Sequence, residues 1–120
     1  MRSDLKTLHW SVFNPSLPQL AALGRSQRAI DFGIRDLAEA RAYLADPVLR
    51  ANLIAAAEAV LTHPDTPIEQ IMGPVDALKL RSCATLFEAA SEGREPVFAR
   101  LLDTFYAGSR CPLTRAELSR

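Results

Sequence analysis

Lys79 is the charged residue best placed for chemistry, because it interrupts the apolar stretch DALKLRSCATLFEAAS at residues 76–91. On a helical wheel Lys79 falls between Cys83 and Leu86, inside an otherwise apolar arc. Burying a lysine without a partner is costly, so two interpretations stay open. Either the side chain carries the ammonium to solvent from the first turn of the helix, or the ammonium forms the cationic edge of a pocket together with Ser82 on the same side.

Three residues near the start, Lys6, His9 and Trp10, form a second candidate group. Imidazole titrates near neutral pH and indole offers a flat apolar face. His9 could therefore act as a general base, or could stack on a ligand together with Trp10. The alternative is that Trp10 anchors the core.

The tripeptide from Gly24 through Arg25 to Ser26 is a third candidate, for an anion. Backbone N–H groups at a helix start bind anions, and Arg25 would add a charge beside them. A turn followed by Ser26 as an N-cap explains the same residues without any ligand.

No catalytic arrangement is recognisable in the chain. There is no nucleophile elbow and no His-Glu-x-x-His helix, and the two cysteines lack the spacing of metal ligands. Cys83 is instead typical of a small core residue. We therefore predict no metal and no cofactor, assign no catalytic residue, and leave open whether the protein is an enzyme.

Composition limits the classes of partner. The 120 residues include 14 basic and 14 acidic side chains, so net charge favours neither nucleic acid nor an anionic membrane surface. No apolar run approaches the roughly 20 residues that span a bilayer. The start, MRSDLKTLHW, lacks the apolar core of a secretory signal, so we expect a reduced cytoplasm.

The pattern of helix signals predicts one all-α domain over residues 1–120. Residues 1–24 should be irregular, because Pro15 and Pro18 restrict the backbone, and a brief helix should follow from Ser26. Later helix starts carry a capping residue with a proline or an acid after it: Asp36 with Glu39, Asp46 with Pro47, Thr66 with Pro67, and Thr114 with Glu117. Another helix should begin near Glu95 and Pro96. No segment alternates apolar and polar residues, so no strand is expected.

The helix over residues 76–91 should lie at the centre of about six short helices. Its apolar residues occupy one broad arc and a second stripe through Leu78 and Ala89, so other helices must pack on both sides. We expect Phe87 at the middle of the core, surrounded by Leu53, Leu80, Leu86 and Phe98. The remaining edge, formed by Arg81, Thr85 and Glu88, reads as a solvated face.

Three segments resemble the strongest blocks of an uncharacterised, mainly bacterial family, domain of unknown function eighteen-ten. They are ALGRS at 22–26, LAEARAYLADPVL at 37–49 and DALKLRSCATLF at 76–87, and KTLHW and FARLLDTFY extend the resemblance over nearly the whole chain. The resemblance implies a compact all-α domain and no established activity. Some members are automatically labelled calpastatin, but calpastatins are disordered polar inhibitors, whereas this chain is 48% hydrophobic.

The N-terminal part departs from the family pattern. SVFNPSL separates the Lys-His-Trp block from Pro18 and Gln19, and a second Trp is absent. In the family an amphipathic helix usually precedes this block, whereas here only five residues precede it. We therefore expect an N-terminally shortened member with an apolar patch on the helices beginning at Pro47 and Asp76. Either the insertion, through Val12, Phe13 and Leu17, or a second copy in a homodimer should cover that patch, and a homodimer is favoured.

Two functions from different classes follow. One is binding of a small anionic ligand by a set of side chains drawn from all three candidate groups: Lys6, His9, Trp10, Arg25, Ser26, Lys79 and Ser82. The other is an interaction or structural module without a small-molecule site. Convergence of the basic groups on one concavity would favour the first.

Overall fold

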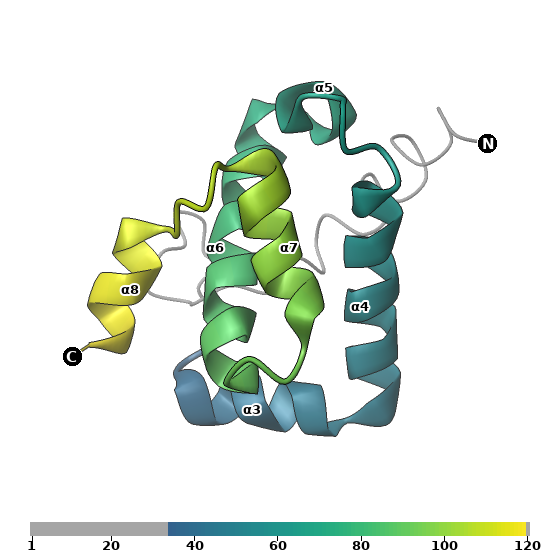
Figure 1. Cartoon of the computed structure of the whole chain (residues 1–120). Helices are drawn as coiled ribbons and strands as arrows, with labels where there is room; N and C mark the ends of the chain where they lie inside the picture. Colours follow the sequence, from purple (N-terminus) through teal and green to yellow (C-terminus); the bar gives the residue numbers. More distant parts are fainter. Residues whose placement is uncertain (1–33, 120) are drawn as a thin grey trace.

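A computed structural model describes residues 34–119, and these residues form helices joined by short turns, with no extended strand (Figure 1). The helices are α3 (Leu37–Ala45), α4 (Pro47–Leu61), α5 (Ile68–Met72), α6 (Pro74–Ser91), α7 (Pro96–Phe105) and α8 (Pro112–Leu118). The prediction of a compact all-α domain is confirmed. None of these helices combines the length and the apolar character needed to cross a bilayer.

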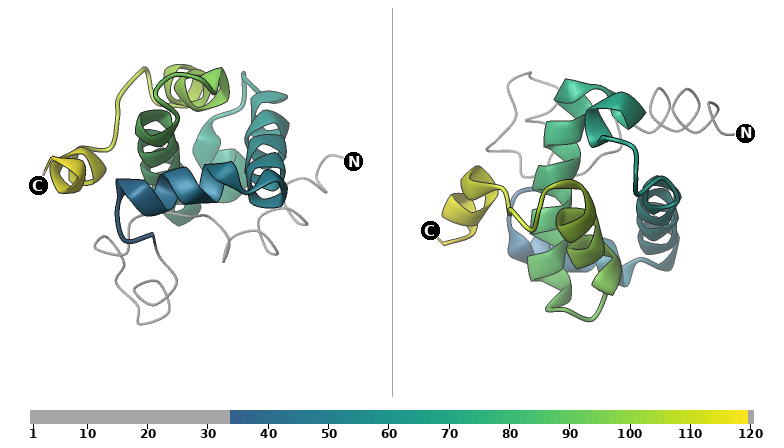
Figure 2. Two further views of the ribbon diagram at one scale, coloured as in Figure 1. Left: turned by 90° about the horizontal axis from the view of Figure 1, so that it is seen from below. Right: turned by 45° about the horizontal axis from the view of Figure 1, so that its top comes forward.

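Helix α6 is the element around which the others pack. It contacts α3, α5, α7 and α8, while α3 crosses one end of it and leads into α4 (Figures 1 and 2). Ten of its eighteen residues are buried. Phe87 is fully buried between the rings of Tyr43 and Phe98, with ring centroids 5.3 and 5.8 Å away. The central place predicted for this helix and for Phe87 is therefore confirmed.

Side-chain caps fix where α3 and α4 begin. The Asp36 carboxylate accepts from the Glu39 N–H at 2.9 Å, and Asp46 accepts from two N–H groups in the first turn after Pro47. These bonds satisfy donors that have no partner within the helix. A full capping box would also have the Glu39 carboxylate accept from the N–H of Asp36, but here it accepts from the N–H of Arg35.

Two predicted caps were wrong. Pro67 occupies the cap position of α5 without a side-chain hydrogen bond, so Thr66 does not cap that helix. Helix α8 begins at Pro112 after Cys111, which places Thr114 inside the helix and fully buried. Proline at the first helical position has its φ already set for a helix, and here that signal outweighs the capping pattern further on.

The prediction that a second apolar stripe of α6 packs against other helices was also wrong at the N-terminal end of that stripe. Leu78 is 64% exposed, and Val75 one turn earlier is equally open to solvent. On α4, Leu49 is partly exposed and Val48 beside it more so. The described part of the chain therefore leaves apolar side chains uncovered at the N-terminal ends of both helices.

Candidate ligand site between helices α6 and α8

One edge of α6 holds the segment that leads into α8. Arg81 donates from Nε to the carbonyl of Ser109 at 3.1 Å and from Nη2 to that of Arg110 at 3.0 Å. The Thr85 hydroxyl accepts from the backbone N–H of Cys111 at 2.9 Å. Reading this edge as a solvated face was wrong, because Thr85 is buried and Arg81 is half-buried against this segment.

The third residue of that edge, Glu88, forms a two-point ion pair with Arg110. Arg110 Nε donates to Oε1 at 2.9 Å, and Nη2 donates to Oε2. Arg110 Nη1 donates to the Gly108 carbonyl at 2.7 Å and lies 3.6 Å from an oxygen of Asp103. Paired donors from a planar guanidinium match the two oxygens of a carboxylate. All three nitrogens of Arg110 are therefore engaged.

This ion pair also sets the protonation of the carboxyl. The hydrogen bonds from Arg110 hold the pKa of Glu88 below its ordinary value, against an opposing effect of burial. The charges of Arg110 and Arg115 lower that pKa further. Glu88 is consequently a carboxylate at neutral pH and stays paired with Arg110.

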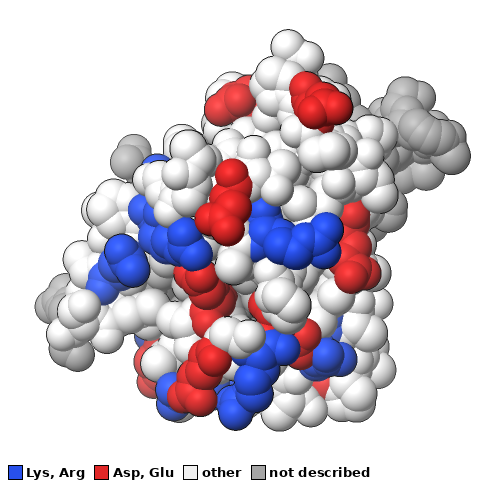
Figure 3. All heavy atoms as spheres, in the orientation of Figure 1, with Lys and Arg blue, Asp and Glu red and all other residues white. Residues whose placement is uncertain are grey.

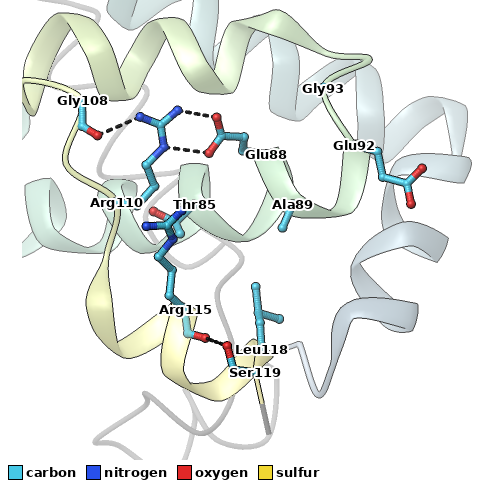
Figure 4. A pocket seen from close by; sticks show the side chains of 10 residues that line it. All are labelled: Thr85, Glu88, Ala89, Glu92, Gly93, Gly108, Arg110, Arg115, Leu118 and Ser119. Carbon is cyan, nitrogen blue, oxygen red and sulfur yellow. Dashed lines mark hydrogen bonds and ion pairs between the residues drawn. The ribbon is translucent and has the colours of Figure 1, made fainter.

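Beside the ion pair lies a hollow of about 730 Å³ between α6, the segment around Gly108 and α8. Figure 4 shows the side chains that line it: Thr85, Glu88, Ala89, Glu92, Gly93, Gly108, Arg110, Arg115, Leu118 and Ser119. The exposed Arg115 side chain reaches from α8 toward Thr85 and the ion pair (Figure 4). The hollow thus brings together residues that are far apart in sequence.

The charges in the hollow are not equally available. Glu88 is paired with Arg110, and Glu92 lies 3.1 Å from Arg41 and 3.4 Å from Arg94. Among the described residues the Arg115 guanidinium makes no hydrogen bond or ion pair. The lining holds two acids and two bases, and the one charge without a hydrogen bond or ion pair within residues 34–119 is positive.

Of the predicted ligand residues, Lys79 and Ser82 fall within the described part, and neither lines this hollow. Lys79 is half-buried and forms no ion pair with the described residues. Burial raises the pKa of the Asp76 carboxyl, and the positive charge of Lys79 opposes that effect. Ser82 is buried, and its hydroxyl lies 3.3 Å from both the Leu78 carbonyl and the Cys111 sulfur.

The other predicted ligand residues lie outside the described part of the chain. They are Lys6, His9, Trp10, Arg25 and Ser26. Their convergence with Lys79 stays a prediction, as does the brief helix from Ser26.

Comparison with known proteins gives the family. The model of a family described as protein of unknown function (DUF1810) matches residues 1–118. The chain belongs to this family. The crystal structure of the conserved hypothetical protein Rv1873 from Mycobacterium tuberculosis is 32% identical, with a TM-score of 0.82, over 98% of this chain and 97% of that one. A search of curated proteins finds no match.

Membership in DUF1810 confirms the resemblance seen in the sequence, and it brings no activity with it. The residues of the hollow were missed by sequence reasoning. Glu88 and Arg110 are 22 positions apart, and neither belongs to a recognisable motif. The position of Cys111 at the start of α8 could have been found from the sequence, because Cys111 directly precedes Pro112, and proline is favoured at the first position of a helix.

The surroundings of Cys111 differ from those of the other cysteine. Burial raises the pKa of both thiols, and for Cys83 nothing opposes it. At Cys111 the hydroxyls of Ser82 and Thr114 and the N–H groups of Leu113 and Thr114 outweigh burial, so the pKa falls below its ordinary value. Within residues 34–119, neither cysteine belongs to a group of three possible metal ligands.

Proposed function

We propose that the protein binds a small anionic ligand in the hollow between α6 and α8, with Arg115 as the residue that meets the anion. The observation that carries this proposal is the guanidinium of Arg115, which is exposed to the hollow and makes no hydrogen bond or ion pair with residues 34–119, although its charge acts on Glu88. Both acids of the lining already have arginine partners. An anion would therefore meet one available positive charge and no unpaired carboxylate.

The chemistry of the lining supports a carboxylate or a phosphate. A guanidinium presents paired donors that fit the oxygens of either group, and the carbon atoms of Ala89 and Leu118 provide apolar surface beside it. A large polyanion is a poorer match. Acidic and basic side chains are interspersed over the face in Figure 3, whereas polyanions are bound by surfaces of one sign.

A second position for the anion is beside Lys79, which also has no ion pair within residues 34–119. The predicted set of Lys6, His9, Trp10, Arg25, Ser26, Lys79 and Ser82 would bind there. Substitution of one cation at a time separates the two positions. Lys79→Met and Arg115→Met each remove the charge while keeping much of the volume of the side chain.

Thermal unfolding in the presence of inorganic phosphate, citrate and nucleotides tests the proposal. A ligand that binds only the folded state raises the Tm, by an amount equivalent to about 2.7 kcal/mol when its concentration is 100 times Kd. Arg115→Met should abolish the shift and Lys79→Met should leave it intact. Arg100→Met removes an exposed arginine of α7 that is remote from the lining, and it should behave as the parent.

Other patterns of Tm shift among these variants would place the site elsewhere or exclude it. Loss of the shift in Lys79→Met alone would move the site to α6, and equal shifts in all three variants would exclude both cations. A parent protein that no anion stabilises would contradict the proposal. In that case the interaction module is the better description.

The interaction module is favoured by the apolar side chains left uncovered on α6. Val75 and Leu78 lie three residues apart, so they share one face of the helix, and both are largely exposed. A second copy of the chain would cover them in a two-fold dimer. Sedimentation should then show a dimer at micromolar concentration that Leu78→Glu converts to monomer, while Glu69→Lys, at an exposed position of α5, leaves it unchanged.

We also infer a bacterial, cytoplasmic protein. The similarity to a mycobacterial protein supports the origin, and two free thiols support a reducing compartment.

A further inference from the structure

The two cysteines of the chain occupy environments of opposite kinds. Cys83 lies within α6, 1% exposed, among the apolar side chains of the core. Cys111 is 7% exposed and lies against the polar edge of α6, where the Ser82 hydroxyl is 3.3 Å from its sulfur. The chain therefore contains its own unreactive reference thiol.

Thr114 adds an observation that the packing does not explain. Its side chain is fully buried, yet its hydroxyl has no conventional hydrogen bond within the described residues. A buried polar group without a partner is rare and costs about 1–3 kcal/mol. This hydroxyl favours the thiolate of Cys111, so ionisation of the sulfur would supply the missing acceptor.

Uncharged donors account for the ease with which Cys111 ionises. Charged groups are carried by every element packed here: Lys79, Arg81 and Glu88 on α6, Arg110 in the preceding segment, and Arg115 and Glu117 on α8. The lowered pKa of the thiol comes from the Ser82 and Thr114 hydroxyls and the N–H groups of Leu113 and Thr114, which together outweigh the effect of burial. The effect should therefore change little with salt.

We propose that Cys111 is a modification site, a thiolate that reacts with small uncharged oxidants of the peroxide class while Cys83 stays unmodified. The thiolate attacks one oxygen of hydrogen peroxide, forming an S–O bond as the O–O bond breaks. The leaving hydroxide takes a proton to become water. Sulfur is thereby oxidised to sulfenic acid and the peroxide is reduced.

The first test measures oxidation of the folded protein by hydrogen peroxide, with dimedone trapping the sulfenic acid and mass spectrometry locating it. We expect trapping at Cys111 at least tenfold faster than at Cys83, unchanged in Cys83→Ala and lost in Cys111→Ala. Comparable rates at the two cysteines, or trapping that appears only in denaturant, would overturn the proposal.

The second test removes the hydroxyl alone. The oxidation rate should rise with pH around a midpoint below the value of about 8.5 for a free thiol. Thr114→Val keeps the shape of the side chain and removes a hydroxyl that has no conventional partner, so it should fold and should move the midpoint upward. A shift of one unit lowers the thiolate fraction about tenfold at a pH below the midpoint.

Ser82→Ala should act in the same direction, and Thr104→Val, which removes an exposed hydroxyl of α7 outside the hollow, serves as the matched control. Circular dichroism confirms that each variant is folded. A midpoint at or above that of a free thiol, or one that neither Thr114→Val nor Ser82→Ala changes, would show that the hydroxyls do not activate Cys111.

Discussion

The two sides of α6 are held in different ways. Toward α3 and α7, Phe87 packs between Tyr43 and Phe98 in a core without charge. Toward the segment before α8, Arg81, Thr85 and Glu88 act through hydrogen bonds and one ion pair. Apolar packing is non-directional and supplies most of the stability, whereas the polar contacts are directional and fix where α8 and its arginine lie.

The largest effect should come from the apolar side. Phe87→Ala removes a fully buried ring and leaves a cavity, which typically costs about 3–5 kcal/mol. Denaturant unfolding measures this loss. Leu78→Ala, on the same helix but 64% exposed, is the matched control and should change little. A loss below about 1 kcal/mol for Phe87→Ala would mean that the core is not centred on this ring.

The ion pair on the polar side should give a smaller loss. Glu88→Gln keeps the shape but removes the charge that Arg110 binds, and hydrogen bonds to charged groups contribute about 1.5–3 kcal/mol. Unfolding of the variant and the parent should be compared at neutral pH. Helix content should be retained, because the apolar core is untouched.

The stabilities of the parent protein and Glu88→Gln should also respond differently to acid. The folded pKa of Glu88 is lowered, so its contribution is fully present above the ordinary glutamate pKa and is lost as pH falls through the folded value. The stability difference between parent and Glu88→Gln should therefore shrink on acidification. A difference that does not depend on pH would show that the charge of Glu88 is not what stabilises the polar side.

The smallest effect should come from an ion pair that is open to solvent. Arg41 and Glu92 lie 3.1 Å apart with about half of each side chain exposed, and such pairs typically contribute 0–1 kcal/mol. Arg41→Met should change stability by less than the Glu88 variant, and added salt should remove the difference. An effect as large as that of Glu88→Gln would show that partial burial is not what separates the two pairs.

Much of the fold could be predicted because its signals are local. Asp46 followed by Pro47 marks the start of α4, and the 3.6-residue period of apolar residues places α6 at the centre. The errors occurred where two signals competed or where exposure was in question. Pro112 outweighed Thr114 at the start of α8, and periodicity alone gave no means of seeing that Leu78 faces solvent.

What the sequence by itself determined is therefore the set of helices, the caps of α3 and α4 and the buried face of α6, since each depends on residues within a few turns of each other. Tertiary structure alone decided the candidate sites. Arg110 meets Glu88 from 22 positions away, and the Cys111 sulfur meets the Ser82 hydroxyl across 29. Such pairs depend on the path of the chain between α7 and α8. Once that path is set, it determines which charges are neutralised, and it leaves Arg115 without a hydrogen bond or ion pair among residues 34–119.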